Sequence, residues 1–240
     1  MPGGAIRAAV LGVALFAWAP ARAQNPAQRT ELEEALGRPK TAPVVPAELR
    51  AMVRTAERDR LVVRGLNGAD IEVDISEKEP ERFAGFGGGR FFGFSFLGYE
   101  HFGFILVDRA AEAAEAVIAT GEAPAFSSDG RYFAAAQITE GGFGNLEAVA
   151  VWEVLPGRSV RRFLTDSLPR AFDWRVDGWP RPDCAAVSAI DIAWEPPDGV
   201  DHAEAMRSAP RSQYQIEIDG EGVMLRSSVA SAVCGVVPAE

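Results

Sequence analysis

Apolar and polar residues alternate along much of this chain, which is the pattern of antiparallel strands with one buried face. Residues 61–64 and 71–75 alternate in this way and flank Asn67-Gly68, a dipeptide typical of tight hairpin turns. The isoleucine and valine residues of 71–75 would face inward, and the acidic residues between them would face outward. A strict two-residue turn would place Arg64 opposite Ile71, so we expect a longer loop or a bulge in this hairpin.

Two segments before this hairpin have helical periodicity instead. Residues 27–36 predict a short helix, followed by a stiff, proline-rich connector that reaches Pro46. A second helix is predicted from Pro46 onward, because proline is well tolerated at the first helical position. Its buried face would carry the apolar residues at i, i+3, i+4 and i+7 spacing, which are Leu49, Met52, Val53 and Ala56.

Phenylalanine and glycine are concentrated in residues 83–104. We expect a glycine-rich loop followed by two core strands, because aromatic side chains dominate the burial of apolar surface. An aromatic binding surface or a mobile lid is the alternative for the same stretch. Residues 110–119 contain enough alanine for a helix, but a return strand over 115–119 is the simplest connection, and we predict that strand.

A short polar turn over residues 127–131 precedes the clearest strand pattern of the chain. Asp129 can accept hydrogen bonds from backbone N–H groups there, and Gly130 can adopt a positive φ. A strand is predicted from Tyr132 onward, with a partner strand over 146–154. The Ser-Ser-Asp-Gly-Arg turn resembles the Ser-Pro-Asp-Gly-Arg turn of TolB-like β-propeller blades, over roughly residues 102–154. The resemblance implies a blade-like antiparallel meander and brings no particular activity with it.

The rest of the chain continues the β pattern. Residues 160–164 and 186–194 predict strands, a polar loop is expected over 196–210, and a last hairpin pairs 214–218 with 223–227. A closed propeller needs at least four blades, and the sequence shows no repeat of that period. We therefore predict a mainly β fold, an antiparallel meander of blade-like hairpins with one or two N-terminal helices and not a closed propeller.

The first residues have the pattern of a secretory signal peptide. A positively charged start and an apolar run precede Ala21-Arg22-Ala23, a small-x-small cleavage site. Residues 1–23 would be removed, 24–46 would form the N-terminal helix and proline-rich linker, and 47–240 a single β-rich domain. The apolar run is too short to span a bilayer as a mature helix. We expect a periplasmic or secreted protein with no membrane insertion after signal cleavage.

Charge and cysteine content narrow the function further. The formal net charge is −10, and so acidic a chain repels nucleic acid and anionic lipid, which makes neither an expected partner. The two cysteines, Cys184 and Cys234, lack the C-x-x-C spacing that lowers the pKa of a redox-active thiol. In an oxidising compartment we predict that they form a structural disulfide.

Few residues offer catalytic or metal chemistry. The two histidines are His101 and His202, and no G-x-S-x-G motif supports a serine triad. The acidic segment 198–204 around His202 could hold a divalent cation, but it does not match an EF-hand loop, and a zinc site needs three or four committed ligands. We predict no metal and no cofactor. An envelope hydrolase that uses His101 or His202 with acidic neighbours is the alternative function.

The preferred candidate for ligand recognition is a set of two tryptophans and two arginines, Trp174, Arg175, Trp179 and Arg181. Indole and guanidinium groups of this kind could stack on a sugar or a peptide. The competing interpretation is that the tryptophans close the edge of the core beneath a long loop. We predict a non-catalytic accessory or binding protein whose partner is an envelope protein or a small ligand. A structural module that docks through its N-terminal helix is a third hypothesis.

Overall fold

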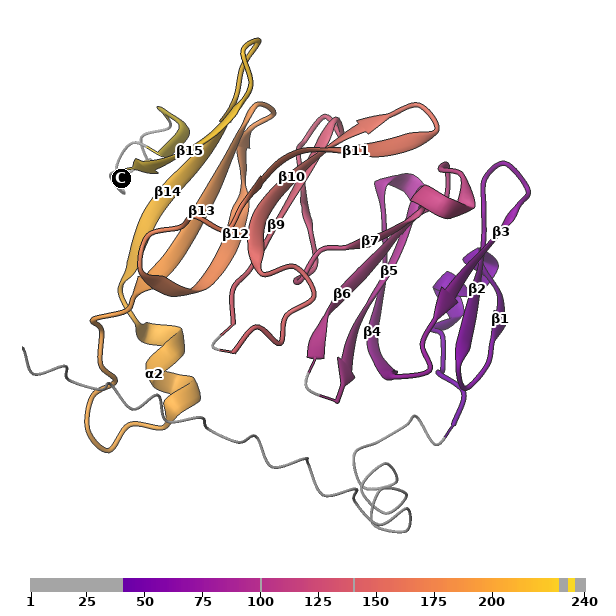
Figure 1. The fold of residues 1–240 in the computed structure, drawn as a ribbon, viewed down its shortest axis with the longest axis horizontal. Coiled ribbons are helices and arrows are strands. Elements are labelled where there is room, and N and C mark those ends of the chain that lie inside the picture. Colours follow the sequence, from indigo (N-terminus) through magenta and orange to yellow (C-terminus); the bar gives the residue numbers. More distant parts are fainter. Residues whose placement is uncertain (1–40, 100, 140, 229–232, 236–240) are drawn as a thin grey trace, which may run out of the picture. The chain divides into compact units, whose positions relative to one another are not determined.

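The computed structural model describes residues 41–99, 101–139, 141–228 and 233–235. These residues form four antiparallel sheets, which confirms the predicted mainly β meander that does not close into a barrel (Figure 1). All of them belong to one compact unit. The predicted signal peptide and the predicted helix over 27–36 lie outside the described residues.

Each sheet consists of consecutive strands of the chain. The first sheet comprises β1 (Val53–Ala56), β2 (Arg60–Arg64) and β3 (Asp70–Asp74). The second comprises β4 (Lys78–Phe86), β5 (Phe91–Gly98), β6 (His101–Asp108) and β7 (Val117–Ala119). The third comprises β8 (Ala125–Phe126), β9 (Tyr132–Gln137), β10 (Ala148–Leu155) and β11 (Arg158–Thr165). The fourth comprises β12 (Ala171–Arg181), β13 (Cys184–Asp191), β14 (Arg211–Ile218) and β15 (Val223–Ser228).

The hairpin of β2 and β3 forms as the alternating pattern predicts. Ile71 and Val73 are buried, and the acidic residues of β3 are exposed. Arg64 pairs with Asp70, so residues 65–69 form a loop longer than two residues, as expected from the pattern. The Asn67 side chain accepts a hydrogen bond from the backbone N–H of Ala69 (3.0 Å) and closes this loop locally.

The prediction of a helix from Pro46 onward is wrong for its second half, residues 53–56. A 3-10 helix, η1 (Ala47–Met52), is followed directly by strand β1, and Val53 pairs with Val63 of β2. The spacing of Leu49, Met52 and Val53 fits a helix, yet all three still contact the core, because a 3-10 turn followed by a strand can also turn them inward. Pairing with β2 therefore overrides the local helical periodicity.

The phenylalanine- and glycine-rich stretch forms core strands joined by a glycine turn, as predicted. The turn is the short 3-10 segment η2 (Gly87–Gly89), between β4 and β5. Five phenylalanines of β5 and β6 are buried, namely Phe91, Phe92, Phe94, Phe96 and Phe104. The chain then returns through η3 (Ala113–Glu115) and the strand β7, so the predicted return strand is present but shorter than 115–119.

The polar turn over 127–131 joins β8 to β9 and has the predicted chemistry. The Asp129 carboxylate accepts hydrogen bonds from the backbone N–H of Arg131 (3.1 Å), from the Ser127 hydroxyl (2.8 Å) and from the Arg131 guanidinium (2.5 Å). Gly130 adopts a φ of 70° and turns the chain. The strands within 102–154 belong to two sheets, since β6 and β7 lie in the second and β8 to β10 in the third. The resemblance to a TolB-like blade stays a prediction.

Asp129→Asn is expected to lower the melting temperature by about 2 to 4 °C at pH 7 and by less as the pH falls toward 2. The Arg131 side-chain hydrogen bond is the main cause that lowers the pKa of Asp129 from 3.8 to about 2. A depressed carboxyl pKa stabilises the fold above the unfolded pKa, and this contribution is lost between about pH 4 and pH 2. Melting curves of both proteins from pH 7 to pH 2.5 check this. A constant difference across that range would contradict it, and Asp198→Asn serves as the control.

The fourth sheet contains two departures from the predicted elements. The segment around Trp174 and Trp179, for which the sequence predicts no strand, is the long strand β12, which contains three shifts of register against β13. The polar segment 196–210 contains a short helix, α2 (His202–Ser208), in which Ala205 is buried. The strand predicted over 186–194 forms as β13, which spans Cys184–Asp191. The last hairpin, β14 with β15, forms as predicted.

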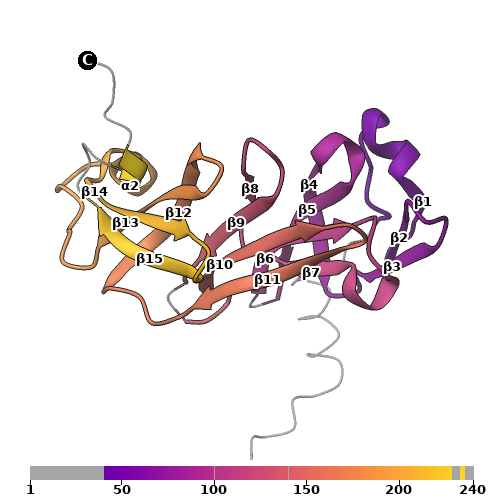
Figure 2. The same ribbon diagram turned by 90° about the horizontal axis from the view of Figure 1, so that it is seen from above.

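The four sheets follow one another side by side in chain order (Figures 1 and 2), and an apolar cluster joins each sheet to the next. The first and second sheets share a cluster that includes Ile75 and Phe94, and the second and third share one that includes Phe91 and Phe133. The third and fourth share a cluster that includes Val151. Each sheet therefore buries its apolar residues mainly against its neighbours in chain order.

A buried ion pair ties the second sheet to the third. The Asp108 carboxylate, fully buried, accepts hydrogen bonds from the Arg90 guanidinium (2.9 and 2.8 Å) and from the Ser159 hydroxyl (2.7 Å). The same guanidinium donates to the carbonyl of Leu155 (2.8 Å), next to the turn between β10 and β11. These contacts fix the end of the third sheet against the second.

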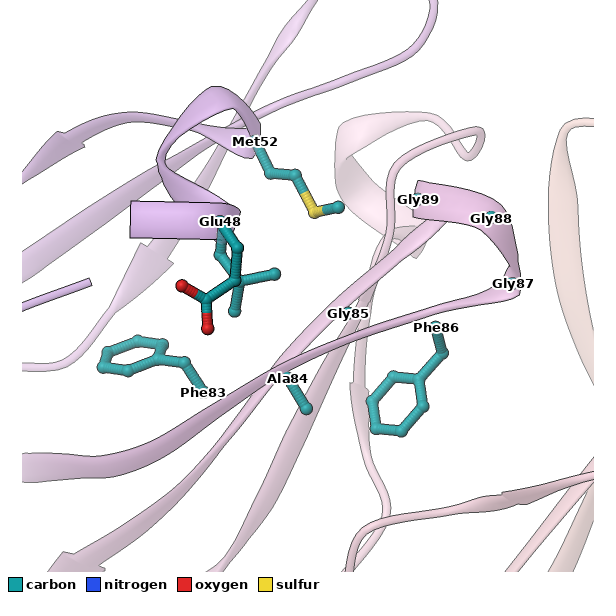
Figure 3. A pocket seen from close by; sticks show the side chains of 10 residues that line it. Glu48, Met52, Phe83, Ala84, Gly85, Phe86, Gly87, Gly88 and Gly89 are labelled. Carbon is teal, nitrogen blue, oxygen red and sulfur yellow. The ribbon is translucent and has the colours of Figure 1, made fainter. Parts of the chain in front are cut away.

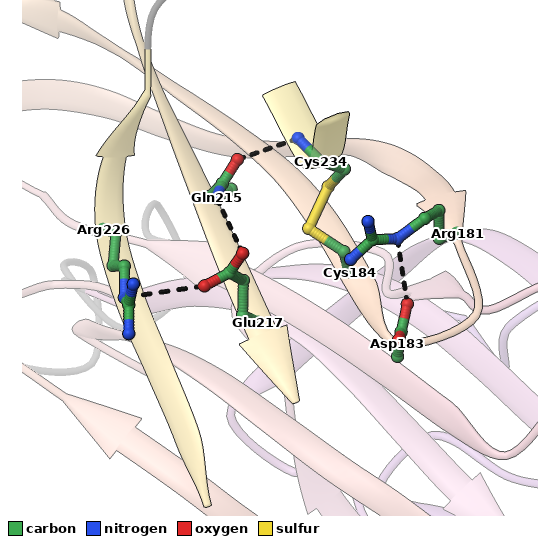
Figure 4. Close-up of a disulfide and its surroundings, with 7 residues drawn as sticks. All are labelled: Arg181, Asp183, Cys184, Gln215, Glu217, Arg226 and Cys234. Atoms are coloured by element: carbon green, nitrogen blue, oxygen red, sulfur yellow. Dashed lines mark hydrogen bonds and ion pairs between the residues drawn. A yellow bond between two sulfur atoms is a disulfide. The ribbon is translucent and has the colours of Figure 1, made fainter. Parts of the chain in front are cut away.

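The structure contains the predicted disulfide between Cys184 and Cys234, with the two Cα atoms 5.8 Å apart (Figure 4). Cys184 begins β13, and Cys234 lies in the short segment η4 (Val233–Gly235). The Gln215 side chain of β14 accepts a hydrogen bond from the backbone N–H of Cys234 (2.8 Å). The bond therefore holds the C-terminal segment on the fourth sheet.

Candidate functional site

The predicted recognition residues Trp174 and Trp179 are packed into the protein. Trp174 is 2% exposed, and its indole N–H donates to the carbonyl of Ala171 (3.1 Å). The indole N–H of Trp179 donates to the carbonyl of Ala125 (2.9 Å), and its ring stacks on Tyr132 (centroids 6.2 Å apart). These contacts favour the interpretation that both tryptophans close the core between the third and fourth sheets.

The two arginines of the same set point to other partners. The Arg175 guanidinium pairs with Asp173, and that of Arg181 pairs with Asp183 (3.1 Å; Figure 4). Trp174 and Arg175 are neighbours on a strand, so their side chains face opposite sides of the sheet. The structure does not gather the four residues on one surface, and a ligand site made of them stays a prediction.

The two histidines lie on different elements of the structure. His101 begins β6, its Nδ1 lies 2.9 Å from the carbonyl oxygen of Tyr99, and its ring packs on Phe96. His202 begins α2, and its side chain lies outside what the structure describes. Within the described residues, no group of three His, Cys, Asp or Glu side chains is placed to hold a metal ion. The hydrolase hypothesis stays a prediction.

Two acidic side chains, Glu122 and Asp173, influence each other near the start of β12. Burial raises the pKa of Glu122, the Asp173 carboxylate raises it further, and Arg175 lowers it. Asp173 has a φ of 50° and also accepts a hydrogen bond from Arg211 (2.6 Å), which in turn donates to the Ser188 hydroxyl (2.8 Å). Because Asp173, Ser188 and Arg211 bond one another across β12, β13 and β14, we explain the network as a structural tie.

Four exposed apolar side chains lie on the β5–β6 hairpin and on the loop between β9 and β10, two segments that backbone hydrogen bonds join. We call them the Phe143 patch: Leu97 (50% exposed), Tyr99 (55%), Phe102 (39%) and Phe143 (43%). Leu97 and Phe102 are direct cross-strand partners, and Tyr99 follows in the turn. The backbone N–H of Phe102 donates to the carbonyl of Phe143 (2.9 Å), which joins the loop to the hairpin.

The loop that presents Phe143 is held by a dense set of hydrogen bonds. The Glu147 carboxylate accepts from the backbone N–H groups of Thr139 (3.0 Å) and Gly144 (2.6 Å) and from the Thr139 hydroxyl. That hydroxyl accepts from the backbone N–H of Phe143 (2.9 Å). The Asn145 side chain donates to the carbonyl of Phe104 (3.0 Å) and fastens the loop to β6.

This arrangement has an energetic cost. Glu147 adopts a φ of 50°, a conformation that costs a residue other than glycine about 1 kcal/mol or more. Strained residues of this kind persist where the surroundings hold them, and they cluster at functional sites. The loop that these hydrogen bonds hold carries the exposed ring of Phe143. That combination makes the Phe143 patch a candidate binding surface.

A second candidate is a groove of about 400 Å³ beside strand β4, which we call the β4 groove (Figure 3). One side is formed by η1, with Leu49 and Met52, and the other by β4 and the glycine turn that follows it. Phe83 and Phe86 line it from β4, and Glu48 is its one charged lining residue among those the structure describes.

No protein-family model matches this chain, and no curated protein matches its sequence. Function is therefore argued from the residues of the two candidate surfaces. None of the helices in the described part of the chain is long and apolar enough to cross a bilayer.

Proposed function

We propose that this protein is an exported, non-catalytic binding protein that docks onto an apolar surface of another envelope protein through the Phe143 patch. The observation that carries the proposal is the strained, hydrogen-bonded loop that keeps Phe143 exposed beside Phe102. Exposed aromatic side chains at the centre of a polar surface are typical of residues that dominate protein–protein affinity. The signal-peptide pattern supports export, and the disulfide fits an oxidising compartment.

The surroundings of the patch support a protein partner over a charged ligand. Its four members are uncharged, and the carboxylate of Glu147 is already occupied by hydrogen bonds from within the loop. A rigid loop also loses little conformational entropy on binding, which favours affinity. A partner surface of matching shape and low charge is therefore the expected ligand.

The double variant Phe102→Ser, Phe143→Ser is expected to lose the partner. Two aromatic residues at an interface centre each contribute about 2 kcal/mol, or about 4 kcal/mol together, so affinity for the partner should fall by about several hundredfold. The mature proteins would be immobilised and exposed to their own envelope fraction, and bound proteins quantified by mass spectrometry. Leu164→Ser, a similarly exposed residue of β11, is the matched control and should capture the partner like the wild type.

The proposal fails if the double variant captures the same proteins in the same amounts, or if the wild type captures none above the bead background. Melting temperatures of the three proteins should agree within about 2 °C, since the substituted rings are partly exposed. Such agreement would exclude unfolding as the cause of a loss.

A further inference from the structure

The free edge of β4 differs from the other sheet edges of the described chain. Strand edges expose unpaired backbone groups, and proteins guard them with charges, prolines, bulges or short strands. The first half of β4 is guarded in this way by the run Lys78-Glu79-Pro80-Glu81-Arg82 and by a shift of register after Pro80. The second half, residues 83–86, has the sequence Phe-Ala-Gly-Phe and pairs regularly with β5. It carries none of these guards.

The remaining edge strands described by the structure each have a guard. The strands β7 and β8 are three and two residues long. In the longer edge strands charged residues leave no uncharged run of more than three residues, such as 163–165 of β11 and 223–225 of β15. An uncharged edge of four residues is thus particular to β4.

The position of the β4 groove shows that this edge is accessible. Residues 83 to 86 all line the groove (Figure 3). Because β4 is the terminal strand of its sheet, one alternating set of their backbone groups has no neighbouring strand. The groove therefore lies beside the free edge of β4, where backbone donors and acceptors are available to a ligand.

The walls of the groove suit an extended apolar chain. A Cβ atom added to Gly85 would lie 3.1 Å from Leu49 and 3.3 Å from Met52, so the glycine allows η1 to pack closely over β4. Leu49, Met52 and Phe83 supply apolar contacts, and the exposed Glu48 carboxylate supplies a negative charge.

We propose that the β4 groove binds an extended, apolar segment of another polypeptide, which pairs with residues 83–86 as an additional strand and places a basic residue near Glu48. Main-chain hydrogen bonds would supply affinity and the walls selectivity, as in other cases of strand addition. The negative charge in the groove favours a cationic peptide. The net charge of −10 disfavours a second copy of this chain. This site lies outside the Phe143 patch, so the two proposals stand or fall separately.

The first test uses fluorescein-labelled Lys-Val-Thr-Val-Thr-Val amide as the probe and the mature protein in low salt, with binding followed by fluorescence anisotropy. Two further probes carry N-methyl groups on one or the other alternating set of backbone amides. In an antiparallel pair only one alternating set of N–H groups faces the neighbouring strand. One methylated probe should therefore lose binding at least tenfold, and the other should bind much like the parent. Equal binding by both, or no saturable binding of the parent, overturns the proposal.

Variants of the protein locate the site. Ala84→Lys places a charge on the edge and should weaken binding at least tenfold. Glu48→Lys should weaken binding of the lysine-containing probe by up to about fivefold, because an exposed ion pair contributes little. Glu79→Lys makes the same change of charge on β4 outside the groove and should leave binding unchanged. If Glu79→Lys weakens binding as much as Glu48→Lys, the role of Glu48 is overturned.

A photo-crosslinking amino acid at position 84 of the mature chain identifies the occupant directly. Crosslinks to the added probe support the proposal. Crosslinks to residues 24–40 of the same chain, undiminished by excess probe, would instead assign the groove to its own N-terminal segment. Crosslinks to a second copy would assign it to self-association, and either result overturns binding of a foreign peptide.

Discussion

Asp108→Ala is expected to destabilise the folded protein by about 3 to 5 kcal/mol. The carboxylate is fully buried and accepts two hydrogen bonds from Arg90, one from Ser159 and one from the backbone N–H of Ala110 (3.1 Å). Removing it leaves a guanidinium that is four-fifths buried without its counter-charge. The second and third sheets would lose the hydrogen bonds that join them. Most of the expected loss of stability comes from the unpaired, buried charge of Arg90.

Urea unfolding followed by tryptophan fluorescence measures this loss, since linear extrapolation to zero denaturant gives the free energy of unfolding in water. Asp70→Ala is the matched control, because Asp70 pairs with Arg54 at the surface and both side chains are exposed. That variant should lose less than about 1 kcal/mol. A loss of similar size in both variants would contradict a special role for the buried pair.

The double variant Cys184→Ser, Cys234→Ser is expected to lose about 2 to 5 kcal/mol of stability. The bond joins residues 50 positions apart, and without it the unfolded chain gains conformational freedom. Both cysteines are buried, so the serine hydroxyls would also lose contact with water. The fourth sheet would lose its hold on the segment that contains Cys234, whose backbone bonds to Gln215.

Urea unfolding with and without a reductant separates these effects. Reductant should shift the wild type to lower urea and leave the double variant unchanged. If reduced and oxidised wild type unfold at the same urea concentration, the bond contributes nothing to stability. If Trp174 and Trp179 keep their environments in the reduced protein, the structural change is confined to the segment that contains Cys234.

The sequence specifies much of the β structure through local signals. The alternation over 71–75 and the Asn67-Gly68 turn predict the β2–β3 hairpin, and the Asp129-Gly130 turn predicts the start of β9. The phenylalanine-rich strands follow from the large area that aromatic residues must bury. These signals work because each strand pairs with its neighbour in the chain, so that local pattern and tertiary structure agree.

The errors arise where pairing or packing decides between two local patterns. Residues 53–56 fit a helix by spacing, yet they pair with β2 as a strand. The helix α2 is a single short element with few apolar residues, so its signal is weak within a polar segment. The sequence offers Trp174 as a ligand contact because the burial of its side chain between the third and fourth sheets cannot be read from the residues around it.

Both candidate surfaces depend on contacts between segments that are distant in sequence. Phe143 reaches Phe102 through a loop whose conformation is set by Glu147 and Thr139, and the glycines around Phe143 were the one available signal. The β4 groove exists because η1 packs over Gly85, which no periodicity of β4 alone reveals. The sequence feature that indicates this groove is an uncharged strand segment followed by a glycine turn, residues 83–89.

The pairing of each strand with its neighbours in chain order has a consequence for how the protein is made. Every sheet can form from residues that have already emerged, without waiting for distant parts of the chain, and such local topology favours rapid folding. A chain that appears from its N-terminus could thus complete its sheets one after another. The Cys184–Cys234 bond is the exception, because Cys184 must remain reduced until Cys234 arrives. Formation of that bond would mark the moment when assembly of the fourth sheet is finished.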